Sequence, residues 1–222
     1  MTLERSVLAV VLLLTVWGIG SFGIWDPWEL VVADAARGLG ESADTASTYT
    51  PLSTWMVGAA FRAFGVHEWS GRLPGVVAGW LTCLLTFGWM RKHVSRLAGV
   101  AAIAVLASTP LFLLNARLLC GDVVEVLAQT WVGLLAFEVC SAKRGMRRAL
   151  PRWVLLALGL AFSAYASGVL LGPLPPMAAV AAWRLLSDDA EGGDHVGRWL
   201  LPAAAAILTV GVVHAIWLDD PE

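Results

Sequence analysis

The chain has 222 residues, of which 58% are hydrophobic and only 14% charged, and its formal net charge is −2. Soluble domains carry about 45–50% apolar and about 25% charged residues, so this composition excludes an ordinary soluble domain. No basic patch stands out, and nucleic acid is not expected as a partner. The apolar residues form runs close to the ~20 residues that a membrane-crossing helix needs. We therefore predict an all-α, polytopic membrane helix bundle with about seven transmembrane helices.

Seven apolar runs are predicted as the spans of one transmembrane domain that covers residues 1–222. The first run exceeds the ~7–15 residues of a signal-peptide core and no cleavage site follows it, so it is predicted to stay as an anchor. The sixth run is short and follows a proline-rich entry, and the fifth and sixth could instead form one broken hairpin that does not cross. The predicted spans are Val7–Ile24, Leu73–Met90, Leu97–Leu114, Val123–Val139, Trp153–Leu171, Leu174–Leu186 and Trp199–Leu218.

The loop charges predict the orientation of these spans. With the N-terminus in the cytoplasm, the cytoplasmic loops are 91–96, 141–152 and 187–198, and the first extracytoplasmic loop is 25–72. Eleven of the fifteen lysine and arginine residues then lie inside, as the positive-inside rule requires. The four outside are Arg37, Arg62, Arg72 and Arg117. We expect an integral protein of a bacterial-type inner (plasma) membrane.

The loop 25–72 is too long for a plain connector, and its sequence predicts two helices. Asp26 as N-cap and Pro27 at the first helical position start a short helix over Trp28–Leu39, which ends at Gly38 or Gly40. Pro51 opens a second helix, Pro51–Phe64, whose apolar residues recur at helical spacing on one face. Such amphipathic helices are typical of the membrane interface, and we expect both to lie there. Four tryptophans suit that depth: Trp25, Trp28, Trp55 and Trp69.

This loop and the next two spans contain a series of short motifs in a fixed order along the chain. They are Gly23–Glu29, Ala33–Arg37, Thr50–Leu52 with Trp55, Phe64–Val66, Arg72–Pro74, Ser108–Phe112, Ala116–Arg117 and Asp122. Together they resemble the polytopic glycosyltransferases of the GT-C fold, the group of the protein O-mannosyltransferases and the lipid A aminoarabinose transferase. The resemblance implies transfer of a sugar from a polyprenyl-phosphate donor to an extracytoplasmic lipid, glycan or protein acceptor. It also implies inversion at the anomeric carbon and an acidic residue of the first loop as catalytic base.

Asp26 and Glu29 are the candidates for that base. An acceptor hydroxyl is a poor nucleophile until a carboxylate within ~2.6–3.2 Å takes its proton. The alternative is a purely structural role for both residues. Asp26 would then be an N-cap, and Glu29 would be a first-turn carboxylate favoured by the helix dipole. A cap and a catalytic role can coexist in one residue.

Four further residues are predicted to contact the substrate. Arg72 and Arg117 fall at predicted outer membrane edges, where a planar guanidinium suits the lipid phosphate, although both could merely snorkel to headgroups. Asp122 begins a span and would orient the acceptor or a metal, unless it is only an N-cap. Trp55 could stack on a sugar. No two of the four histidines have ligand spacing, so no metal site is predicted; no cofactor follows from the motifs, and a divalent metal stays open.

Three departures from the family pattern favour a second interpretation. Trp28 stands where many members have an aspartate before the glutamate. Tyr49 and Thr50 stand where many members have a lysine and a proline before Pro51, and Ser167 replaces a lysine before Gly168. The alternative function is therefore a non-catalytic membrane scaffold or assembly subunit that keeps the fold and accompanies a larger transferase partner subunit. A transporter or flippase component ranks third, because inverted repeats are not found in the sequence.

Overall fold

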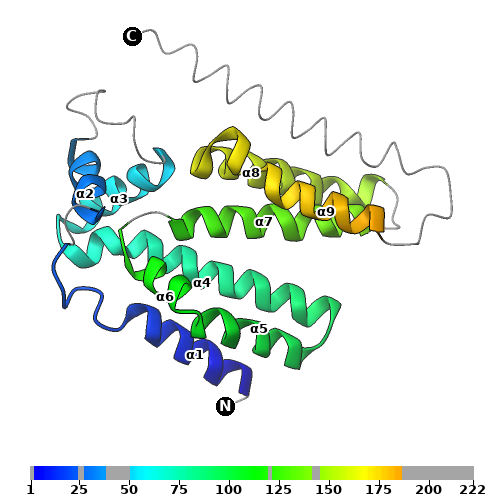
Figure 1. Cartoon of the computed structure of the whole chain (residues 1–222), viewed down its shortest axis with the longest axis horizontal. Coiled ribbons are helices and arrows are strands. Elements are labelled where there is room, and N and C mark those ends of the chain that lie inside the picture. The colour runs from blue at the N-terminus through cyan, green and yellow to red at the C-terminus, as the bar shows by residue number, and fades with distance from the viewer. Residues whose placement is uncertain (1–2, 25–27, 39–50, 120–121, 142–145, 187–222) are drawn as a thin grey trace, which may run out of the picture. The chain divides into compact units, whose positions relative to one another are not determined.

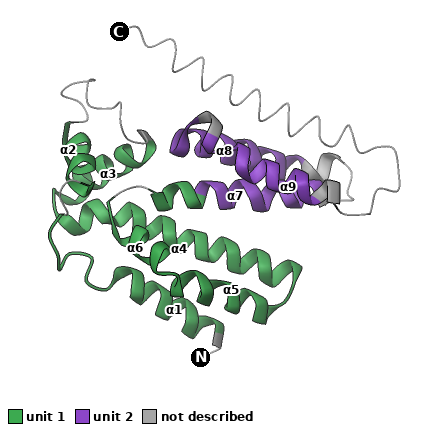
Figure 2. Ribbon diagram, viewed as in Figure 1, with its two compact units in different colours: residues 1–127 green, residues 128–222 purple. Residues whose placement is uncertain are grey.

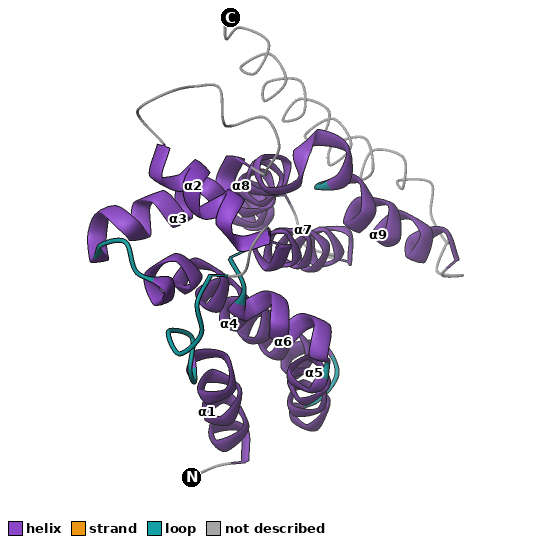
Figure 3. Cartoon of the chain, turned by 60° about the vertical axis from the view of Figure 1, so that its left-hand side comes forward, coloured by secondary structure: helices purple, strands orange, loops and turns teal. Residues whose placement is uncertain are grey.

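The computed structural model describes residues 3–24, 28–38, 51–119, 122–141 and 146–186. Regular structure in these ranges is entirely helical (Figure 1), and Figure 3 draws the helices in purple and no strand. This agrees with the predicted all-α class. The helices are α1 (Leu3–Val16), α2 (Trp28–Gly38), α3 (Pro51–Phe64), α4 (Glu68–His93), α5 (Arg96–Ser108), α6 (Pro110–Arg117), α7 (Asp122–Ser141), α8 (Met146–Leu171) and α9 (Leu174–Leu186).

The chain divides into two compact units, residues 1–127 and residues 128–222 (Figure 2). The first unit holds α1 to α6 and the start of α7. Its central element is α4, which packs against α1, α3, α5 and α6. The second unit holds the rest of α7 together with α8 and α9. All candidate site residues from the sequence lie in the first unit.

The long helix α4 is fixed at its start by Ser70, which is fully buried. The Ser70 hydroxyl accepts a hydrogen bond from the His67 backbone N–H at 3.1 Å, and it lies 2.7 Å from the Gly65 carbonyl, to which it donates. This satisfies a backbone N–H group that a helix start leaves without an intrahelical partner. From this start α4 runs for 26 residues and is long and apolar enough to cross a membrane.

The predicted third span, Leu97–Leu114, is not one straight helix. It divides into α5 and α6, which meet at an angle of 70°. Thr109 lies between them in an extended conformation, and Pro110 starts α6. A proline lacks the backbone N–H that would continue α5, so it ends one helix and opens the next.

The two helices predicted in the first loop are both present. α3 has the predicted bounds, and α2 ends at Gly38, which is one of the two predicted ends. They share an apolar core: Val32, Ala33, Ala36, Val57, Phe61 and Leu119 are buried, and Ile24 packs against them. Trp28 and Trp55 remain 68% and 57% exposed on α2 and α3. That these helices lie in the membrane interface stays a prediction.

The second unit has its own apolar core between α7, α8 and α9. Its buried members are Val132, Ala136, Cys140, Leu156, Leu160 and Val180. α8 is interrupted at Gly168, whose φ of 76° is a left-handed conformation that glycine adopts without a Cβ penalty. The stretch Leu150–Gly168 is apolar enough to cross a membrane, whereas α9 has only 13 residues.

Among the described residues, three helices could cross a membrane, or four if the bent pair α5–α6 is one span. α1 is shorter than predicted: it ends at Val16, and Gly18 just beyond has a φ of 71°. The predicted span Trp199–Leu218 lies outside the described residues. The count of seven spans therefore stays a prediction.

Candidate functional site

Glu29 and Arg72 form a buried ion pair at the end of the first unit where α4 begins. Arg72 Nε donates to Glu29 Oε1 at 2.9 Å, and Arg72 Nη2 donates to Oε2 at 2.6 Å. Both side chains are 0% exposed. The two parallel bonds make the fork geometry in which arginine holds a carboxylate most specifically. Because Glu29 belongs to α2 and Arg72 to α4, this pair ties the first-loop helix to the central helix.

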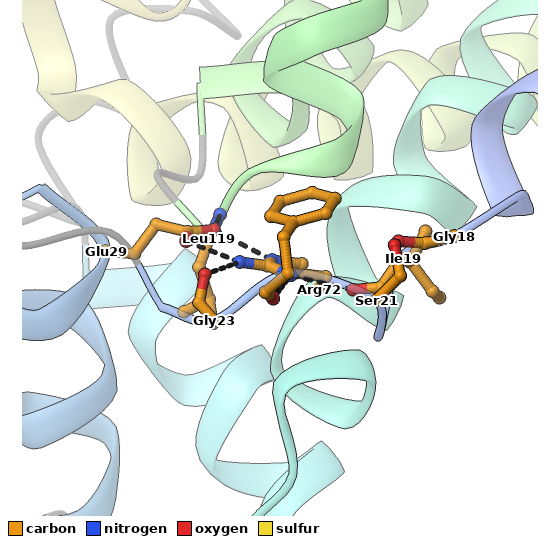
Figure 4. Close-up of polar contacts among 8 residues, drawn as sticks. Gly18, Ile19, Ser21, Gly23, Glu29, Arg72 and Leu119 are labelled. Carbon is orange, nitrogen blue, oxygen red and sulfur yellow. Dashed lines mark hydrogen bonds and ion pairs between the residues drawn. The ribbon is translucent and has the colours of Figure 1, made fainter.

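The remaining donors of Arg72 bind the backbone that follows α1. Nη1 donates to the carbonyls of Ile19 and Phe22 at 2.7 and 2.8 Å, and Nη2 donates to the carbonyl of Gly23 at 2.8 Å. The Phe22 ring lies against the guanidinium, 4.0 Å from Cζ to the ring centroid. Figure 4 shows the guanidinium between Glu29 and Gly23 on one side and Ile19 and Ser21 on the other. A guanidinium has five N–H donors, so all five of Arg72 are in use.

Glu29 also binds the connection between α6 and α7. Its Oε1 accepts a hydrogen bond from the Leu119 backbone N–H at 2.9 Å (Figure 4). Leu119 is itself buried and belongs to the core shared by α2 and α3. The carboxylate of Glu29 thus accepts three hydrogen bonds from two different segments. Because the side chain is also 0% exposed, a substrate has no direct access to this carboxylate in the structure.

A row of glycines on α4 allows the α6–α7 connection to come this close. Gly71, Gly75 and Gly79 follow one another at intervals of four residues and are all buried. A Cβ on Gly75 would lie only 3.2 Å from the carbonyl oxygen of Ala116 and 3.3 Å from that of Leu118. Small residues at this spacing let two backbones approach within a membrane. This spacing is visible in the sequence, but it does not indicate which segment packs against the glycines.

Arg117, at the end of α6, differs from Arg72. One Nη2 hydrogen bond, to the carbonyl of Trp17, is the only hydrogen bond of its side chain to a described residue. Its Nε is buried and has no acceptor there. Its Cζ lies 5.8 Å from the centroid of the same Phe22 ring that Arg72 contacts. Of the two arginines predicted to bind phosphate, only Arg117 keeps unused N–H donors in the described part of the chain.

The other predicted site residues are placed as follows. Asp122 is the first residue of α7, three positions after Leu119, and is exposed. Trp55 projects from α3 with a largely exposed ring. Asp26 lies outside the described residues, between Gly23 and Glu29. The structure therefore brings Glu29 and Arg72 into direct contact. Asp122 follows Leu119, whose backbone N–H binds Glu29, by three residues.

No group of three or more histidine, cysteine, aspartate or glutamate side chains that could hold a metal occurs in the described ranges. From the sequence, Glu29 is expected in the first extracytoplasmic loop and Arg72 at the outer membrane edge on the same side, but an ion pair between them is not predicted. They are 43 residues apart, and no local pattern links an acid on one helix to a base on another.

Comparison with known proteins adds the family. No curated protein matches the chain, and no solved structure matches it. The model of the family described as dolichyl-phosphate-mannose-protein mannosyltransferase matches residues 48–217. The match begins after α2, so Asp26 and Glu29 precede it. It covers more than half of the chain and confirms the resemblance, so this integral membrane protein belongs to the dolichyl-phosphate-mannose-protein mannosyltransferase family, a family of membrane glycosyltransferases.

Proposed function

We propose that this protein transfers a sugar, with inversion, from a polyprenyl-phosphate donor to an acceptor on the extracytoplasmic side of the membrane. The family match carries this proposal. The family is described by a lipid-phosphate mannose donor, which makes mannose the first sugar to test. The acceptor class, whether lipid, glycan or protein, is left to the experiment.

The general base in this proposal is Asp26. Glu29 is the other candidate, but its carboxylate is fully buried and accepts three hydrogen bonds. A base needs a free lone pair within ~2.6–3.2 Å of the acceptor proton. The Glu29 side chain is 0% exposed, so an acceptor hydroxyl could reach it only if the packing around the pair with Arg72 opened. Glu29 is therefore assigned to holding the loop, and Asp26, three residues earlier, to the proton transfer.

The donor phosphate is assigned to Arg117. A leaving lipid phosphate needs cationic N–H donors, and a guanidinium offers them in a planar fork. Arg117 retains unused donors in the described residues, whereas all those of Arg72 are bound to Glu29 and to backbone carbonyls. Asp122 orients the acceptor, and Trp55 offers its exposed ring to the sugar.

The test is transfer of radiolabelled mannose from a short-chain polyprenyl-phosphate mannose in membranes that contain the full chain. Wild type is expected to label a membrane acceptor, and Asp26→Asn to abolish the labelling while the protein still folds. Tyr165→Phe, a change in the second unit outside the assigned site, serves as a control for expression and insertion. Undiminished labelling by Asp26→Asn would remove the base assignment.

A scaffold subunit is the second candidate function, and one observation favours it. Both candidates for the catalytic base, Asp26 and Glu29, precede the matched range, and Glu29 is engaged in a buried ion pair with Arg72. A wild-type chain that labels nothing alone, yet co-purifies with a larger transferase and raises its activity, would support the scaffold over the enzyme.

A further inference from the structure

We infer that Glu29, Arg72 and the backbone N–H of Leu119 form a positioning node that sets the two chain connections carrying Asp26 and Asp122 relative to each other. The inference rests on the proposed function for its catalytic consequence. Its structural part stands on the hydrogen bonds of Glu29 and Arg72 alone.

The first connection is held on both sides of Asp26. Arg72 Nη2 donates to the carbonyl of Gly23 and also to Glu29 Oε2, so one nitrogen binds a described residue before Asp26 and one after it. Nη1 holds Ile19 and Phe22 further upstream. A single guanidinium thus fixes where the chain enters and where it leaves the stretch that contains Asp26.

The second connection is held through Glu29. Its Oε1 receives Arg72 Nε–H and Leu119 N–H, each at 2.9 Å. Leu119 precedes Asp122 by three residues, and Asp122 opens α7. Glu29 Oε1 therefore binds both Arg72 and Leu119. Through this oxygen, the residues on either side of Asp26 are linked to the connection that leads to Asp122.

The node behaves as a unit because it is buried. Both charged side chains are 0% exposed, so a lost partner cannot be replaced by bulk water. Buried polar networks are strong when every group is satisfied and costly when one is not. Removing any member should release both connections together. We expect a positioning effect on the chemical step, because a displacement of about 1 Å at reacting groups can cost about 100-fold in rate.

The test compares Glu29→Gln and Glu29→Ala with Asp34→Asn, all in α2. Asp34 forms an exposed i,i+3 ion pair with Arg37, at 3.2 Å, and is a matched control for the loss of one carboxylate charge on this helix. Hydrogen exchange at the Leu119 amide is the structural measurement. Glu29→Ala should accelerate it strongly, Glu29→Gln less because the amide oxygen can still accept, and Asp34→Asn not at all.

Kinetics with the polyprenyl-phosphate mannose donor give the functional measurement. Glu29→Ala should lower kcat by about 100-fold with donor KM changed less than about threefold, and Glu29→Gln should fall between it and wild type. Asp34→Asn should match wild type in both. Equal loss of kcat in Glu29→Ala and Asp34→Asn, or a loss confined to donor KM, would overturn the positioning role.

A charge-exchanged double variant, Glu29→Arg with Arg72→Glu, separates the node from a simple ion pair. The exchange keeps one acid and one base, but it turns a carboxylate towards the carbonyls of Ile19, Phe22 and Gly23 and removes the acceptor for Leu119. We expect no recovery of Leu119 protection or of kcat. Recovery would mean that the pair matters only for its charge and would refute the node.

The exchange measurements also separate this inference from the proposed function. If wild type transfers no sugar, the proposed function fails, while slow exchange at Leu119 that Glu29→Ala abolishes would still support the node as a structural device. If wild type transfers sugar and Glu29→Ala leaves both measurements unchanged, the node fails and the proposed function survives.

Discussion

Ion pairs between glutamate and arginine occur at both ends of α4, in opposite environments. At the start of α4, Glu29 and Arg72 are fully buried and joined by two short hydrogen bonds. Near its end, roughly 30 Å along the helix axis, Glu4 of α1 lies 2.7 Å from Arg96 and 3.9 Å from Arg91. There the Arg96 side chain is 66% exposed.

The comparison separates two roles that the same side chains can have. Arg91 and Arg96 are 50% and 66% exposed and Glu4 is 16% exposed, so these two arginines can exchange their partner for water at little cost. Ion pairs at the surface contribute about 0–1 kcal/mol. The buried pair has no such exchange, so its geometry is imposed on the segments it joins. The positions of charged residues in the sequence do not distinguish the two cases. Burial and the number of donors in use do.

The largest effect is expected for Arg72→Met, which keeps much of the side-chain volume and removes all five donors. It leaves the buried Glu29 carboxylate without its arginine. The three backbone carbonyls that Arg72 binds also lose their hydrogen-bond donor. Breaking one side of a buried ion pair costs about 3–5 kcal/mol. The free energy of unfolding, measured by SDS titration in mixed micelles, should fall by that amount. A loss below about 1 kcal/mol would mean that the buried pair contributes no more to stability than an exposed surface ion pair.

Arg117→Gln should sharpen the contrast between the two arginines at this end of the molecule. Arg117 has one hydrogen bond to a described residue, so its loss should change the free energy of unfolding by only about 0.5–1.5 kcal/mol. Hydrogen bonds to charged groups contribute about 1.5–3 kcal/mol, so donor KM should rise by about 10–100-fold. The measurements are the SDS titration and transfer kinetics with the polyprenyl-phosphate mannose. A large loss of stability with unchanged KM would reverse the assignment.

Gly75→Ala tests the close approach that brings Leu119 to Glu29. The new methyl would meet the carbonyl oxygens of Ala116 and Leu118 at 3.2 and 3.3 Å, so the connection has to shift. We expect a loss of about 1–3 kcal/mol in the free energy of unfolding and faster hydrogen exchange at the Leu119 amide. Gly88→Ala on the same helix is the control, because a methyl group there would have no neighbour within 4 Å. It should stabilise α4 by about 0.5–1 kcal/mol.

Much of the fold could be predicted from local patterns. Pro51 and the apolar face after it predict the bounds of α3, because a proline at the first turn and a 3.6-residue period are both local signals. The bend between α5 and α6 was not predicted, although Pro110 marks it. Apolar composition measures how long a run is but not its direction, so it predicts Leu97–Leu114 as a span without the 70° bend, and whether the bent pair is one span stays a prediction.

The site could be predicted only in part. Residue type and place in the chain make Glu29 and Arg72 functional candidates, but neither property relates one to the other. Their pairing depends on a contact across 43 residues and on the path of the chain after α1, where Gly18 adopts a φ of 71°. Side-chain chemistry can name a candidate, whereas the number of hydrogen bonds it already makes decides whether it is available to a substrate.

The smallest effect is expected for Glu4→Gln at the other end of α4. The change removes the charge that faces Arg91 and Arg96, both of which are exposed to solvent. It should lower the free energy of unfolding by less than about 1 kcal/mol, and the loss should shrink further at high salt, because exposed charges are screened. Arg72→Met should show almost no salt dependence, since its partner is buried. Equal salt sensitivity of the two variants would mean that burial does not separate the two ends.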